Sequence, residues 1–381
     1  MLKKRDVLCS DGNGEFEAKS PSGVAVRVKA ARNGALATRA CEATLGWNKD
    51  TLTVATLASQ IDLDAWGVDL GLGVPVAAFQ LKKSDADCCM EYQVYSLNKP
   101  PRLLRTITGG EFFNAADTDL DGRIEIWTND AGAVRGFDNL TTIELEAPPL
   151  VLRFERGALL DVSSEFQDYF DRQIARMAKE LDAEALRDFK SSDGKLSPNT
   201  PLPAERLHQL RGVKAKILGI VWCYLYSGRE PQAWSSLAEM WPTEDVGRIR
   251  AAIVSARAKG ISAQVDGVST GIPRKRNKRA PVFDAISESS GTRLEVVPPE
   301  PILLRHPPLP EIPDQDASPS ELLLELVIDS AGKVRSAEPA GKATSADAVL
   351  IPAAAGWKFI PAFKDGRAVA SRMRLAVSLR Q

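Results

Sequence analysis

The chain has 381 residues, enough for two or three domains, and 44% of them are hydrophobic, which can supply a buried core for each. Lysine and arginine total 49 against 50 aspartate and glutamate residues, so the net charge of -1 creates no overall field that would attract nucleic acid or an anionic membrane. Only two histidines are present, and the five cysteines lack zinc-site spacing, so histidine-based catalysis and zinc binding are not expected.

The first region, residues 1–155, follows the period of two that is typical of β-strands. Val24, Val26 and Val28 alternate with small or charged residues, and an Asn-Gly dipeptide at 33–34 supplies a hairpin turn after them. Further runs of strand-forming residues are separated by glycine, aspartate or proline, and they occupy 51–57, 74–81, 92–97, 124–127 and 141–145. The pattern predicts an all-β, sandwich-like domain of roughly ten strands.

One loop in this region, DTDLDGRIEIW at residues 117–127, concentrates carboxylates among strand-forming residues. Carboxylates at this spacing repel one another, so either water screens them or a hard cation lies between them. A calcium loop that starts at Asp117 has carboxylate ligands from Asp117, Asp119 and Asp121 at its positions 1, 3 and 5. The backbone carbonyl of Arg123 stands at position 7 and the Glu125 carboxylate at position 9. Gly122 supplies the sharp turn of such a loop. The alternative is a turn of hydrogen-bonded aspartates surrounded by water.

The acidic loop lacks the bidentate glutamate of a helix-flanked calcium loop, because Thr128 stands at position 12. Strands rather than helices are expected on both sides of it. With this combination, residues 113–128 resemble the Asp-rich hairpins of FG-GAP and VCBS repeats, which implies that Glu125 closes the ligand shell. A weaker copy of this acidic pattern occurs at residues 61–71, IDLDAWGVDLG, and it indicates a second, related unit that lacks part of the ligand set. We therefore expect Ca²⁺ as the cofactor, bound with modest affinity.

From about residue 160 the period changes to that of an α-helix, and residues 160–261 are expected to form a helical domain. A capping box of Ser164 and Gln167 accompanies an apolar stripe formed by Phe166, Phe170, Ile174, Met177 and Leu181. The further helices predicted here are 204–227 before Gly228, 231–241, and 243–260 with Thr243 as its cap.

The predicted helix 231–241 carries a stripe of large apolar residues. Trp234, Leu237 and Trp241 could line a groove for a partner, but large side chains at helical spacing more often pack in a core. We therefore assign the stripe to the core of the helical domain.

Residues 262–319 lose this periodicity, and the stretch 298–319 holds eight prolines, which is typical of an extended, semi-rigid spacer. The basic run RKRNKR at 274–279 has no interleaved aromatic residues and lies in a neutral chain. We interpret it as part of a solvated linker, and a nuclear-targeting or anion-binding patch is the alternative.

The last region, residues 320–381, combines alternating apolar runs with an aromatic motif. The alternating residues are Leu322, Leu324, Leu326 and Ile328 in one run, and Leu375, Val377 and Leu379 in the other. Between them lie an Asp-x-x-Gly turn at 329–332 and the motif Trp-Lys-Phe-x-Pro-Ala at 357–362. This pattern resembles the C-terminal domain of the TonB family, in which two paired strands, a helix and a final strand form one module. We expect Trp357 and Phe359 to cap the core between sheet and helix.

Two features depart from the family pattern. Pro352 falls within the expected helix, which should therefore begin near it or be shortened. The proline-rich stretch 306–316 stands where the family has a leading helix. The resemblance implies a periplasmic module that grips short segments of outer-membrane transporters by adding a strand to a sheet edge. The last strand, 372–379, is the expected edge, and its partner-binding positions are Arg372, Arg374, Ala376 and Ser378.

The chain shows no sequence signature of catalysis. No nucleophile lies beside a histidine base and no phosphate-binding glycine loop occurs, so we do not expect an enzyme. We expect an α+β multidomain protein with a β-rich domain, a helical domain, a linker and a TonB-like end, which binds an envelope or outer-membrane protein segment and not nucleic acid. The alternative is a carbohydrate- or peptidoglycan-associated envelope protein whose β domain carries the activity.

The expected compartment bears on the cysteines. No run approaches the ~18 apolar residues of a membrane span, and no hydrophobic segment follows the basic start of the chain, so neither span nor signal peptide is visible. A cytoplasmic location is thus the alternative to a periplasmic or otherwise exported one. In an exported protein, Cys9 and Cys41, which flank the first hairpin, should form a disulfide. Adjacent Cys88 and Cys89 rarely bond to each other, which favours a free thiol there.

Overall fold

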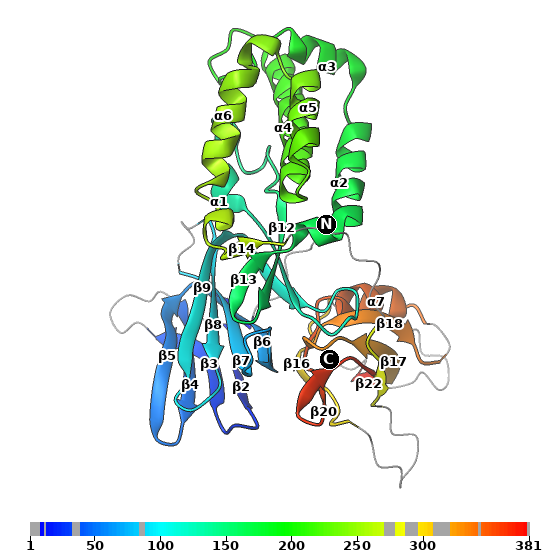
Figure 1. Ribbon diagram of the computed structural model, residues 1–381. Helices are drawn as coiled ribbons and strands as arrows, with labels where there is room; N and C mark the ends of the chain where they lie inside the picture. Colours follow the sequence, from blue (N-terminus) through cyan, green and yellow to red (C-terminus); the bar gives the residue numbers. More distant parts are fainter. Residues whose placement is uncertain are drawn as a thin grey trace.

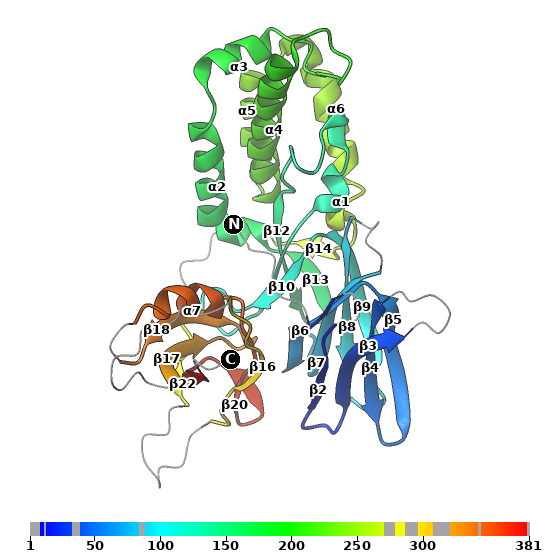
Figure 2. The same cartoon turned by 180° about the vertical axis from the view of Figure 1, so that it is seen from behind.

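The computed structural model of the protein describes residues 8–10, 13–32, 39–83, 88–269, 279–285, 296–307, 321–341 and 344–378. The fold is mixed α+β. In Figure 1, the helices of the middle region form one end of the molecule, and two β-rich bodies, one N-terminal and one C-terminal, lie side by side at the other. Figure 2 shows the same arrangement from behind. No helix in the described part is both long enough and apolar enough to cross a membrane.

The N-terminal body contains two antiparallel sheets that share a core. One sheet contains, in spatial order, β2 (Phe16–Lys19), β3 (Ala25–Arg32), β4 (Arg39–Trp47) and β5 (Asp50–Ala58). The other contains β1 (Cys9–Ser10), β6 (Gln60–Val68), β7 (Val76–Lys82), β8 (Met90–Ser96) and β9 (Arg102–Gly110). Residues such as Val26, Leu45 and Phe79 meet between the sheets. The expected turn at 33–34 lies outside the described residues.

The sheet of β1 and β6 to β9 is covered on its second face as well. Ala78, Val94 and Ile107 belong to the main core, together with residues of the helices and of a third sheet. This third sheet contains β10 (Phe113–Ala116), β11 (Glu125–Asn129), β12 (Pro149–Glu155), β13 (Ala158–Asp161) and β14 (Gly267–Val268). Cover on both faces explains why β6 and β7 are almost continuously buried instead of alternating.

Residues 141–145, expected to be a strand, form a turn. The Glu144 carboxylate accepts hydrogen bonds from the backbone N–H (2.8 Å) and the hydroxyl (2.9 Å) of Thr141, which closes the chain on itself. The Arg211 guanidinium then binds the same carboxylate at 2.6 Å. The predicted strand is therefore wrong, because local side-chain hydrogen bonds compete here with a strand ladder.

The helical end is built around one long central helix. The helices are α1 (Ala131–Val134), α2 (Gln167–Lys179), α3 (Ala183–Lys190), α4 (Ala204–Tyr226), α5 (Glu230–Met240) and α6 (Val246–Arg257). Helix α4 is buried along most of its length, with Trp222 in the core. Leu237 and Trp241 are buried as well, as expected of core residues, whereas Trp234 is half-buried and packs against the core from outside. Helix α3 was not predicted by the sequence pattern.

Two predicted helix caps are wrong. Ser164 lies in a 3-10 turn, η2 (Ser163–Phe166), and its buried hydroxyl has no hydrogen-bond partner in the described part of the chain. Helix α2 follows this turn without a side-chain cap. Thr243 opens a similar turn, η3 (Thr243–Asp245), and α6 begins only after it. In both places the helix axis starts one tight turn later than the pattern predicts.

The C-terminal body is a four-stranded sheet packed against a short helix, α7 (Asp347–Ala354). The sheet contains, in spatial order, β15 (Phe283–Asp284), β22 (Ser371–Ser378), β17 (Glu321–Ile328) and β18 (Val334–Pro339). Trp357 and Phe359 lie in its core, as the motif predicts. The remaining strands are β16 (Glu300–Leu303), β19 (Lys358–Ile360), β20 (Ala362–Lys364) and β21 (Arg367–Val369).

Pro352 lies inside α7, so of the two expectations the one that the helix begins near it is wrong, and α7 is a short helix of 8 residues. The helix begins earlier, where the Asp347 carboxylate accepts a hydrogen bond from the Thr344 hydroxyl (3.1 Å) and another from its backbone N–H. These bonds stabilise the turn that immediately precedes α7. The proline then falls near the end of α7.

The expected spacer, 262–319, contributes three strands where the structure describes it. β14 pairs in parallel with β13, β15 pairs in parallel with β22, and β16 pairs antiparallel with β19. Leu303 reaches the core of the N-terminal body. The expectation of a structureless spacer is therefore wrong for these stretches. Of the basic run 274–279 only Arg279 is described, and the stretch 308–320 lies outside the described residues.

Candidate functional site

The acidic loop connects β10 to β11 and gathers the three aspartates predicted for it. Asp117, Asp119 and Asp121 each place a carboxylate oxygen within 4.8 Å of the others. Asp117 is buried, and its two oxygens accept hydrogen bonds from the backbone N–H groups of Asp121 (2.9 Å) and Gly122 (3.0 Å). Gly122 has a φ of +88°, the left-handed conformation that this sharp turn requires. The loop thus clusters oxygen atoms of the kind that calcium takes as ligands.

The other two predicted ligands lie differently. Glu125 is 1% exposed and is not part of the aspartate cluster. Its carboxylate lies 3.5 Å from the Arg153 guanidinium and accepts a hydrogen bond from the backbone N–H of Thr118 (3.3 Å). The Arg123 side chain binds the Asp121 carboxylate, at 2.9 Å from its Nε atom. The Arg123 side chain therefore contributes a positive charge that partly compensates the loop, whereas the sequence predicts a role only for its backbone carbonyl.

The carboxylates of the loop have raised pKa values. Burial raises the pKa of Glu125 to about 8, and the charges of Asp119 and Asp121 act in the same direction. Burial also raises the pKa of Asp117 and of Asp119, and the charge of Asp121 adds to both shifts. A cation among these oxygens would favour the ionised forms, so the loop has the electrostatics of a site whose negative charge is only partly compensated.

The C-terminal body contacts the acidic loop through the Asp-x-x-Gly turn between β17 and β18. The backbone N–H of Asp117 donates to the Asp329 carboxylate (3.1 Å), and the Ser330 hydroxyl donates to the Asp117 carboxylate (3.1 Å). Arg335 adds a hydrogen bond to the Thr118 carbonyl (2.9 Å). Burial raises the pKa of Asp329 to about 6. The turn that identifies the C-terminal motif is therefore also a docking element.

Two buried ion pairs join the same two bodies beside this turn. Lys333 lies 2.6 Å from the Asp64 carboxylate, Lys358 binds the Asp62 carboxylate, and all four side chains are at most 2% exposed. The Tyr92 hydroxyl also donates to Asp64 (2.8 Å). Burial opposes the ionisation of Asp64, but the charges of Lys333 and Lys358 lower its pKa overall. Figures 1 and 2 both show β6, which carries the two aspartates, next to the C-terminal body.

These pairs correct the interpretation of residues 61–71 as a second acidic loop. Asp62 and Asp64 lie within the strand β6, and their charges are balanced by lysines from the C-terminal body. Among the described residues, the cluster of possible metal ligands is that of Asp117, Asp119 and Asp121. The alternation of aspartates with apolar residues therefore marks a buried interface and not a cation site.

The last strand, β22, pairs with neighbours on both sides. Along one edge it pairs with β17 over its whole length. Along the other edge it pairs in parallel with β15, at Ser371 and Arg372. The N–H of Phe283 donates to the Ala370 carbonyl (3.0 Å), and the N–H of Ala285 donates to the Arg372 carbonyl (2.8 Å). The expectation that β22 is the edge strand is therefore wrong at its start, because β22 is the second strand of its sheet and a segment from the expected spacer covers the first part of its outer edge.

This pairing also fixes which residues of β22 face the outer edge. The N–H and C=O groups of one strand residue point to the same side, and the side alternates along the strand. Because the carbonyls of Ala370 and Arg372 face β15, the backbone groups of Arg374, Ala376 and Ser378 face the same edge, and those of the odd-numbered residues face β17. The four predicted partner-binding positions therefore share the edge that carries β15.

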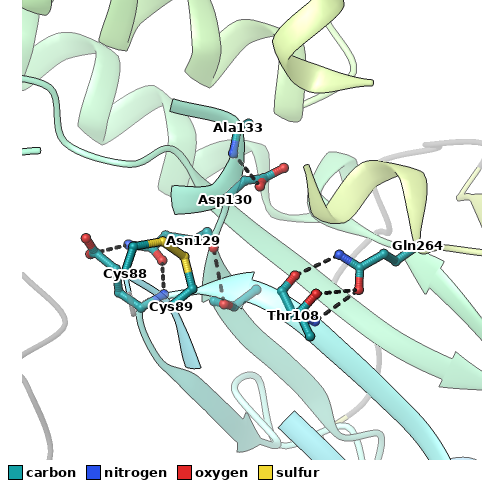
Figure 3. Close-up of a disulfide and its surroundings, with 9 residues drawn as sticks. Cys88, Cys89, Thr108, Asn129, Asp130, Ala133 and Gln264 are labelled. Atoms are coloured by element: carbon teal, nitrogen blue, oxygen red, sulfur yellow. Dashed lines mark hydrogen bonds between the residues drawn. A yellow bond between two sulfur atoms is a disulfide. The ribbon is translucent and has the colours of Figure 1, made fainter. Parts of the chain in front are cut away.

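The cysteines form two disulfides. Cys9 and Cys41 are joined, which ties β1 to β4. Cys88 and Cys89 are joined to each other, so the expectation of a free thiol in this pair is wrong. Figure 3 shows this second bridge beside Asn129, at the end of β11. The remaining cysteine, Cys223, is a buried thiol, and burial raises its pKa to about 12, which leaves it protonated near neutral pH.

A cavity of about 1150 Å³ lies between the helical end and the third sheet. Its walls include the Cys88–Cys89 bridge, Phe112, Tyr169 and Cys223. Within the described walls, no buried polar side-chain atom lacks a hydrogen-bond partner. The cavity therefore gives no sign of the chemistry of a ligand, and the edge of β22 remains the better-defined candidate site.

No protein-family model, curated protein or solved structure matches the chain. A fold by itself does not determine a function, so the function is inferred from the chemistry of these sites.

Proposed function

We propose that this protein is an envelope interaction protein, periplasmic or otherwise exported, that binds an extended segment of an outer-membrane or other envelope protein at the β22 edge. The observation that carries the proposal is the pairing of β15 with β22. A segment outside the last sixty or so residues adds to this edge through main-chain hydrogen bonds, which is the physical basis of recognition by strand addition. A partner segment would make the same bonds in place of β15.

The organisation of the C-terminal body supports a TonB-like module, which we propose as its family. The β17–β18 hairpin, α7, the Trp357–Phe359 core and the final strand β22 follow in the order that the resemblance implies. We likewise propose the division into a β-rich domain (1–155), a helical domain (160–261) and this module (320–381). The separate hydrophobic cluster of the C-terminal module supports the last boundary. The main core joins the third sheet to the helices, so it does not mark a boundary between the first two domains.

We further infer that Ca²⁺ stabilises the β-rich domain by binding to the acidic loop. The clustered oxygens of Asp117, Asp119 and Asp121 and the raised pKa values around them support this inference. The two disulfides support an oxidising compartment, since such bonds persist mainly in exported proteins.

Proline substitutions in β22 test the site. The N–H of Ala376 faces the outer edge, so Ala376→Pro should spare the β17 ladder and remove a donor that a partner strand needs. Ala376→Gly keeps the N–H and is the matched control. Val377→Pro removes a donor to β17 and should destabilise the C-terminal body, which checks the assignment of the two edges.

The probes are fluorescent peptides tiled across the sequences of outer-membrane transporters, titrated against the full-length protein. We expect at least one peptide to bind wild type and Ala376→Gly, and to lose binding to Ala376→Pro while that variant melts close to wild type. Binding that is equal in wild type and Ala376→Pro, or no binding by any peptide of the set, would overturn the proposed function.

A further inference from the structure

The short strand β15 makes side-chain contacts at the β22 edge that indicate which partner the edge accepts. Lys364 Nζ lies 4.2 Å from the centre of the Phe283 ring, a cation–π contact. The carboxylate of the next residue, Asp284, lies 3.7 Å from the Arg372 guanidinium. An aromatic residue and the acidic residue after it are thus both contacted by cations of the C-terminal body.

Arg372 is one of two arginines on the solvent face of β22, whereas Lys364 belongs to β20. Arg372 contacts carboxylates from both neighbouring strands, Glu325 of β17 (3.3 Å) and Asp284 of β15 (3.7 Å). Arg374 follows on the same face and also contacts Glu325 (3.6 Å). Arginines at alternate positions present positive charge to whatever strand lies beside them, and opposite charges across a strand pair are favourable. The outer edge of β22 therefore favours an acidic strand over a basic one.

The β15 segment contacts the rest of the protein at two places, and its contacts with the outer edge of β22 are few. Its ladder with β22 pairs only two residues, and the Asp284 side chain is 72% exposed. Exposed ion pairs contribute little to stability. At its other end the N–H of Ala280 donates to the Leu120 carbonyl of the acidic loop (2.6 Å). Because the segment is tethered to the same chain as β22, its effective concentration at the edge is high although its contacts are few.

We propose that β15 is an internal pseudo-ligand, and that the partner of this edge is an extended peptide, parallel to β22, with an aromatic residue followed directly by an acidic one. This inference rests on the proposed strand addition. The partner displaces Phe283 and Asp284 and takes over their contacts with Lys364 and Arg372. The edge is therefore occupied by its own chain until a matching segment competes for it.

The test uses a peptide with the sequence of residues 279–288 of this chain, RAPVFDAISE, added to the full-length protein. In wild type the internal copy competes with it. A variant that carries Phe283→Ala and Asp284→Ala should bind the peptide about tenfold more tightly or better, because the competing population is removed. Val282→Ala, in the same segment, is the matched control and should bind like wild type.

Charge exchange gives a second readout. The variant should discriminate against a peptide with lysine in place of the aspartate by about tenfold. Arg372→Glu, added to that variant, should reverse the preference, so that the lysine peptide binds more tightly than the aspartate peptide. Rescue of this kind is not expected if Arg372 has only a structural role.

Two results overturn the pseudo-ligand. One is equal affinity of the peptide for wild type and for the variant without Phe283 and Asp284. The other is equal binding of the aspartate and lysine peptides. If transporter peptides still bind in a manner that Ala376→Pro abolishes, the pseudo-ligand fails and strand addition at β22 stands. If neither the transporter peptides nor RAPVFDAISE bind to any form of the protein, both proposals fail.

Discussion

Replacing Lys333 with methionine should destabilise the protein strongly, because it leaves the Asp64 carboxylate buried without its main partner. Both side chains are at most 2% exposed, and Lys333 Nζ lies 2.6 Å from that carboxylate. Removing one member of a buried ion pair costs about 3–5 kcal/mol. In a cooperative unit of about 150–250 residues, each kcal/mol lowers the melting temperature by about 2–4 °C, so the expected drop is roughly 6–20 °C.

Urea unfolding of wild type, Lys333→Met, Asp64→Asn and the double variant measures the coupling. The double variant should recover part of the loss, with an interaction energy of about 1–3 kcal/mol. The pKa of Asp64 is lowered in the folded protein, so the stabilisation is present above its ordinary value of 3.8 and is lost as pH falls through the folded-state pKa. The difference between wild type and Lys333→Met should therefore shrink in acid.

Lys83→Met is the control for this prediction. Lys83 also pairs with a glutamate, at 2.6 Å, but its side chain is 68% exposed. Its loss should change stability by less than about 1 kcal/mol. If Lys333→Met unfolds at the same urea concentration as Lys83→Met, or if the losses in the double variant simply add, the buried pair does not hold the two bodies together.

Three further predictions follow from the cysteines and the acidic loop. Alkylation without reductant should add no label to the native protein and one label, at Cys223, to the denatured protein. After reduction, all five cysteines should be labelled, and mass spectrometry counts the labels. More than one label before reduction would contradict the two disulfides. Calcium at about 10 mM should stabilise wild type by about 1.4–2.7 kcal/mol for a Kd on the order of 10⁻⁴ to 10⁻³ M. Asp119→Asn removes an exposed ligand and should abolish this calcium-induced stabilisation, as measured by calorimetry. Asp168→Asn changes an exposed carboxylate elsewhere and should keep it. In the presence of chelator, the raised pKa of Glu125 contributes stabilisation that is present in full below the ordinary pKa of 4.5 and is lost as pH rises toward about 8. The free energy of unfolding should fall over this range by up to about 1.4 kcal/mol per pH unit, and Glu125→Gln should remove this dependence.

The parts of the fold that the sequence predicts best are those with local patterns. Leu322, Leu324 and Leu326 alternate in the chain and are buried in β17, because one face of that strand meets α7. The clustering of Asp117 and Asp119 is likewise local, since backbone N–H groups within the same turn hold the loop. In both cases the residues that determine the structure are only a few positions apart.

The parts that the sequence does not predict depend on contacts between distant residues. Asp64 and Lys333 are 269 positions apart, and no local pattern says that one neutralises the other. One local signal does point to such a contact: Lys358 stands between the buried aromatic residues Trp357 and Phe359, and a lysine that is buried with them needs an acidic partner. The strand β15 is only two residues long, too short for any periodicity, and its pairing with β22 is visible only in three dimensions.

Amide hydrogen exchange on the full-length protein tests the central claim, strand addition at β22, most directly. The measurement compares the protein alone with the protein saturated by the tightest peptide from the binding assays. Strand addition predicts slower exchange at the Ala376 amide, whose N–H faces the outer edge, together with faster exchange in residues 279–285 as β15 is displaced. Unchanged exchange along β22 with the peptide bound would contradict the account.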